Sequence, residues 1–148
     1  MLRSIVAVIV SYIVMIVFFM AVFTGCFLAL GVERVFQTDS YEVSTLWIGL
    51  TIILSVLGAM IGGYLCAAIS KSKRTCQVFA FIVFLAGLLA CIPAMKRDPD
   101  APNVRAGEIS NFEALQLEVS PMWVHLVTPV LSAAGALLGA RIKGRGNA

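Results

Sequence analysis

Residues 4–32 read SIVAVIVSYIVMIVFFMAVFTGCFLALGV and contain no Asp, Glu, Lys, Arg or His. A helix that crosses the hydrocarbon core of a bilayer needs roughly 20 mainly apolar residues, with a range of about 17–25. This run exceeds that length, so we expect the helix to tilt or to extend beyond the bilayer. It also exceeds the apolar part of a secretory signal peptide, about 7–15 residues, so we expect it to stay in the mature protein.

Three more apolar runs follow, over residues 46–70, 76–95 and 122–140. The chain of 148 residues is 60% hydrophobic and 13% charged. A soluble domain has about 45–50% apolar and about 25% charged residues, so this chain holds more apolar side chain than one soluble core can bury. The sequence therefore predicts an all-α membrane protein with four transmembrane helices in a single domain, residues 1–148.

The charges of the polar segments predict the orientation of the chain. With four spans, one side carries seven basic residues and no acid, whereas the other carries four basic residues and all eight acids. An excess of Lys and Arg in short loops marks the cytoplasmic side. Both termini are therefore expected in the cytoplasm, and the protein in the inner (plasma) membrane of a bacterium. The predicted topology anchors on the basic side are Lys71, Lys73, Arg74, Arg141, Lys143 and Arg145.

The other side holds the longest polar segment, residues 97–121. Ser110 and Glu113 have the spacing of a capping box, which predicts a short amphipathic helix on the outer bilayer surface or on the bundle itself. Trp47 and Trp123 each stand at the start of a span on this side. Both are expected at the membrane interface, where the amphipathic indole ring is favoured.

The second and fourth spans repeat one pattern, a tryptophan near the start and small residues near the inner end. Glycines four residues apart lie on one helix face, and in lipid such faces let helices approach closely. The repeat predicts two tandem helical hairpins related by an axis along the membrane normal. Small residues at Ala21/Gly25 and Ala86/Ala90 give weaker versions in the first and third spans. The predicted packing residues are Gly58, Gly62, Gly63, Gly135 and Gly139. Their faces can either close the bundle or dock another subunit.

The spans offer no charged side chain for catalysis or ion coupling, because they contain no Asp, Glu, Lys or Arg. Intramembrane charges normally mark proton relays and ion pathways. His125 is the candidate cofactor ligand, since imidazole can bind haem iron or the magnesium of a chlorophyll-type pigment. The chain has one histidine, so haem held by two imidazoles of this chain is excluded. The basic tail is expected to contact anionic lipid, not nucleic acid.

The glycine-rich ends of the second and fourth spans, residues 62–68 and 135–141, resemble those of small four-helix bacterial membrane proteins of unknown function. The resemblance implies the same layout and no particular activity. We expect a non-catalytic accessory or scaffold subunit of a larger inner-membrane assembly, with no cofactor or metal, that contacts a protein partner or a second copy of itself.

Two alternatives remain open. One is a small oligomeric channel or transporter, and the other is a pigment-binding or haem-binding subunit that uses His125. Hydroxyl side chains within the spans are the groups expected to line a pore. They are Ser11, Thr24, Thr51, Ser55, Thr128 and Ser132.

Overall fold

The computed structural model describes residues 2–37, 40–95 and 119–145, and most of these are helical. The four long helices are α1 (Leu2–Leu30), α3 (Thr45–Ser70), α4 (Lys73–Met95) and α6 (Met122–Arg145). Each is long and apolar enough to cross a membrane. The predicted all-α class with four helices of membrane-spanning length is confirmed. The amphipathic helix expected from Ser110 lies outside the described residues.

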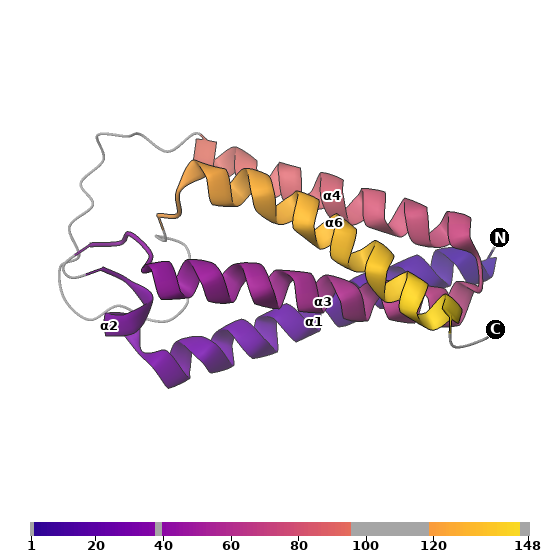
Figure 1. Cartoon of the computed structure of the whole chain (residues 1–148), viewed down its shortest axis with the longest axis horizontal. Coiled ribbons are helices and arrows are strands. Elements are labelled where there is room, and N and C mark those ends of the chain that lie inside the picture. Colours follow the sequence, from indigo (N-terminus) through magenta and orange to yellow (C-terminus); the bar gives the residue numbers. More distant parts are fainter. Residues whose placement is uncertain (1, 38–39, 96–118, 146–148) are drawn as a thin grey trace.

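The four helices alternate in direction, so that α1 runs against α3 and α4 runs against α6 (Figure 1). Both termini and the α3–α4 turn lie at one end of the bundle, which we call the basic end. The opposite end, where α1 joins α3, is called the cap end. The α1/α3 pair and the α4/α6 pair lie close together near the basic end and separate toward the cap end (Figure 1).

Local sequence explains where the helices begin and end. α1 ends at Leu30, two residues before the end expected from the sequence, because Gly31 takes a φ of +72° that favours glycine. α3 begins after Ser44, whose side chain accepts a hydrogen bond from the Trp47 N–H at 3.2 Å. It ends where Lys71 adopts the left-handed conformation, with φ 54° and ψ 21°.

A short folded segment between α1 and α3 closes the cap end of this pair. It contains α2 (Val32–Val35) and an antiparallel bridge between Phe36 and Val43. The Val43 N–H donates to the Val119 carbonyl at 3.2 Å, and the Val119 N–H donates to the Tyr41 carbonyl at 3.0 Å. The segment therefore also holds the chain directly before α6. We name it the cap segment, and no pattern in the sequence predicted it.

The cap segment covers Trp47, which is 1% exposed. Its indole ring makes T-shaped contacts with Phe23 at 5.8 Å and with Phe27 at 6.2 Å between ring centroids. Trp47 is thus a core residue of the cap end and does not face the lipid, because the connecting segment folds back over it. Trp123, by contrast, is exposed at the start of α6.

Candidate functional site

α3 and α6 are in backbone contact along a line of glycines, which we call the seam. A Cβ built at Gly63 would overlap the carbonyl group of Ala136, and a Cβ at Gly139 would overlap that of Met60. At Gly135 a Cβ would stand 2.9 Å from a carbonyl oxygen of α3. Real Cβ atoms do not approach so closely, so these three positions accept glycine and nothing larger without a shift of a helix.

The other two glycines predicted to pack helices face α1 and α4. At Gly58 a Cβ would stand 2.7 Å from the Phe19 ring of α1. At Gly62 it would stand 3.0 Å from the Phe79 ring of α4. All five of the predicted packing glycines therefore lie against other helices of the same chain. A protein partner would have to contact a different surface.

Toward the cap end, a cavity of about 320 Å³ lies among the four long helices. Its walls contain both apolar and hydroxyl side chains, with Tyr12 and Phe19 from α1 and Val83 from α4 among them. Ser11 is buried and Thr24 is exposed, and neither lines the cavity. The other four side chains expected to line a pore all lie in its wall: Thr51 and Ser55 from α3, and Thr128 and Ser132 from α6.

The hydroxyl groups in the wall differ in their hydrogen bonds. Thr128 Oγ1 donates to the Val124 carbonyl at 2.7 Å, a common bond of threonine within a helix. Thr51 Oγ1 is buried and has no partner among the described residues. A buried hydroxyl without a partner costs about 1–3 kcal/mol, so Thr51 favours a water molecule or a polar ligand group in the cavity.

Pro129 lies inside α6 beside the same cavity. Because proline has no N–H, the carbonyl of His125 loses its donor within the helix. Cys91 of α4 supplies the missing donor, with Sγ 2.9 Å from that oxygen. Gly87 lets the two helices approach here, since a Cβ at Gly87 would stand 2.8 Å from the Pro129 ring. No pattern in the sequence pointed to Cys91 as the partner of this carbonyl.

His125, the candidate cofactor ligand, contributes to the cavity wall and is partly buried. Within residues 2–37, 40–95 and 119–145, no three His, Cys, Asp or Glu side chains are grouped so that they could hold a metal ion. Cys66 and Cys76 are free thiols near the basic end, on either side of Ser70. Ser70 Oγ donates to the Cys66 carbonyl at 2.7 Å and lies 4.0 Å from Cys76 Sγ.

A second hollow of about 930 Å³ lies at the basic end, between the α3–α4 turn and the last turns of α6. We call it the basic groove. Arg74 does not line it, and the side chain of Arg145 lies outside the described part. The other four predicted topology anchors do line it, together with three large apolar residues: Lys71, Lys73, Arg141 and Lys143, with Leu137, Leu138 and Ile142.

Comparisons with models of known protein families, with curated proteins and with solved structures found no match. The contacts, cavities and surfaces described above are therefore what supports a function.

Proposed function

We propose that the protein is a non-catalytic accessory or scaffold subunit of a larger membrane assembly, and that α1 contacts the partner. The observation that carries the proposal is an uncovered small-residue face on α1. Ala21 and Gly25, four residues apart, are both exposed. Nothing in the described part of the chain lies within 4 Å of a Cβ built at Gly25. Val17 and Leu28 extend this exposed face along the helix.

Small residues on a membrane helix allow the close contact on which helix association in lipid depends. In α3 and α6 such residues are already in contact within the chain, whereas those of α1 face outward. α1 is also the least buried long helix, with 17% of its apolar stretch buried against 39% for α3. A helix of another subunit, or α1 of a second copy, would complete the contact.

The topology belongs to the same proposal. The α1/α3 and α4/α6 pairs are two tandem hairpins, and both termini lie in the cytoplasm of a bacterium whose inner membrane holds the protein. Two observations support it. The termini and the α3–α4 turn share one end of the bundle (Figure 1). Four basic residues of the predicted cytoplasmic side lie at that end, and an excess of Lys and Arg is typical of the cytoplasmic side: Lys71, Lys73, Arg141 and Lys143.

Purification from the native membrane in a mild detergent tests the proposed contact. The wild type should retain a partner, or a second copy, at fixed stoichiometry. Gly25→Leu should lose it without a change in thermal unfolding, because the site is open within the chain. Ile53→Leu is the control, since Ile53 is exposed on α3. Val83 of α4 is buried and cannot serve as a control. Equal partner recovery from Gly25→Leu and Ile53→Leu would show that α1 is not the docking helix.

A small oligomeric channel or transporter is the second candidate, and the cavity with its four pore-type hydroxyl residues favours it. Its volume of about 320 Å³ corresponds to roughly ten water molecules at about 30 Å³ each. Flux of water, small neutral solutes and monovalent ions into liposomes tests this function. Ser132→Leu should narrow the cavity and reduce flux, whereas Thr24→Leu on the exposed face should not. Wild-type flux through Ser132→Leu, or no flux through the wild type, would exclude this candidate.

A further inference from the structure

We propose that the basic groove is a binding site for one anionic phospholipid, whose phosphate contacts the cations and whose acyl chains lie along α6. The proposal does not depend on the accessory-subunit function. It rests on the charge of the groove, on the order of apolar and charged residues along α6, and on the conformation of Lys71.

The charge of the groove comes from two separate parts of the chain. Lys71 and Lys73 belong to the α3–α4 turn, whereas Arg141 and Lys143 belong to the last turns of α6. No acidic residue is among the described residues that line it. A phosphate group placed there is attracted from both sides, and each Lys or Arg near a membrane surface contributes about a fivefold increase in affinity for anionic lipid.

The apolar residues distinguish a lipid from a free phosphate ion. Leu137, Leu138 and Ile142 line the groove and are exposed. Leu137 precedes Arg141 by one helical turn, about 6 Å along the axis of α6, on the side away from the basic end. Leu137 and Leu138 therefore lie deeper in the bilayer than the backbone of Arg141, whereas Ile142 lies next to it. This order matches a phospholipid whose headgroup stands at the membrane surface and whose acyl chains extend inward.

Lys71 gives a second observation. It is the one described residue other than glycine with a positive φ, 54°. Glycine usually occupies this position at the end of a helix, because a Cβ there is strained. A lysine at a position that favours glycine is explained if its charge is needed in the groove that it lines.

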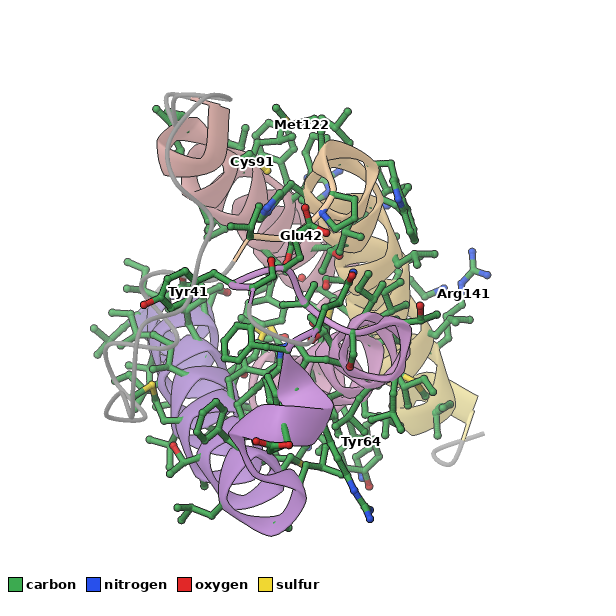
Figure 2. All side chains as sticks on the ribbon, turned by 90° about the vertical axis from the view of Figure 1, so that its left-hand side faces the viewer. Tyr41, Glu42, Tyr64, Cys91, Met122 and Arg141 are labelled. Atoms are coloured by element: carbon green, nitrogen blue, oxygen red, sulfur yellow. The ribbon has the colours of Figure 1, made fainter. Side chains whose placement is uncertain are left out.

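Two cations of α6 differ in how they are held. Lys143 Nζ lies 5.7 Å from the centre of the Tyr64 ring, a cation–π contact that limits the positions of its ammonium group. Arg141 extends away from the ribbon of α6 into open space (Figure 2). Arg141 is thus free to contact a headgroup that approaches from the lipid.

The experiment measures lipid bound to the purified full-length protein by native mass spectrometry, in titrations with phosphatidylglycerol and with phosphatidylcholine. Phosphatidylglycerol should bind in a one-to-one complex that phosphatidylcholine does not form. Lys71→Gln and Arg141→Gln should each weaken it about fivefold, and the double variant about 25-fold. Arg74→Gln is the matched control, because it removes one charge at the same end but outside the groove. Millimolar inorganic phosphate should not displace the lipid, since it cannot contact the apolar wall.

Equal losses for Arg74→Gln and Arg141→Gln would overturn the proposal, because they would indicate general attraction to a basic surface. Displacement of the lipid by inorganic phosphate, or equal binding of phosphatidylcholine, would overturn it as well. Lys71→Gly separates binding from folding. It removes the strained Cβ, so its melting temperature should equal or exceed that of the wild type, while its affinity for phosphatidylglycerol falls about fivefold. Unchanged affinity in Lys71→Gly would exclude Lys71 from the site.

Discussion

Replacing Gly139 with alanine adds a single methyl group where α6 touches α3. The new Cβ would overlap the Met60 carbonyl, with the Met60 Cα 2.9 Å away. Backbone atoms cannot rotate aside as a side chain can, so the two helices must separate along the seam. Overpacking typically costs about 1–3 kcal/mol, and we expect the upper end because several seam contacts lengthen together. Alanine recovers about 0.8–1 kcal/mol of helix propensity. The net loss in the free energy of unfolding is then about 2 kcal/mol.

Gly49 of α3 provides the matched control, because nothing lies within 4 Å of a Cβ built there. Gly49→Ala should stabilise the protein by up to about 1 kcal/mol through helix propensity alone. Unfolding in mixed micelles with rising sodium dodecyl sulfate, followed by far-ultraviolet circular dichroism, measures both variants. The same substitution should change stability in opposite directions at the two sites. A Gly139→Ala variant as stable as Gly49→Ala would refute the view that backbone contact holds α3 and α6 together.

Further predictions concern the second seam glycine, orientation, the Cys91 hydrogen bond and cofactor binding. Gly63→Ala combined with Gly139→Ala should destabilise by less than the sum of the two, since one separation of the helices relieves both overlaps. A reporter active only in the cytoplasm should work when inserted in the α3–α4 turn and fail when inserted after residue 102, and activity at both places would contradict the topology. Cys91→Ala should lower the free energy of unfolding by about 1 kcal/mol, and Cys91→Ser by much less, because serine still donates a hydrogen bond. In a Pro129→Ala background, where the helix regains its own N–H donor, Cys91→Ala should cost almost nothing. His125→Ala should match the wild type in visible absorbance and partner recovery, and loss of an absorbance band would establish the pigment or haem alternative.

The long helices were predictable because the bilayer leaves the chain little choice. A membrane-spanning segment must satisfy its backbone hydrogen bonds internally, so an apolar run of the right length becomes a helix. The remaining differences lie at helix ends, where single residues decide. Gly31 ends α1 before the apolar run ends, and α6 continues to Arg145, beyond the expected end at residue 140.

The contacts between helices were only partly predictable. Spacing placed Gly135 and Gly139 on one face of their helix, but it could not show that Met60 is the group that Gly139 approaches. Which helices pair depends on how all four pack together, and the spacing of residues in a single sequence does not specify those pairs. The cap segment was missed for a related reason. The burial of Trp47 comes from side chains of α1 and of the cap segment that pack on it, and no local periodicity reveals such tertiary contacts.

The α1/α3 and α4/α6 pairs are joined in two places, by the glycine contacts of the seam and by the backbone hydrogen bonds of the cap segment. The seam joins α3 and α6 near the basic end, and at the cap end two backbone hydrogen bonds of Val119 connect the α1/α3 side with the start of α6. Each such bond contributes about 0.5–1.5 kcal/mol, so breaking both costs about 1–3 kcal/mol. The cavity between the helix pairs is already partly open to the surface, so a substitution that removes these two bonds is expected to widen it while the glycine contacts of the seam stay in place.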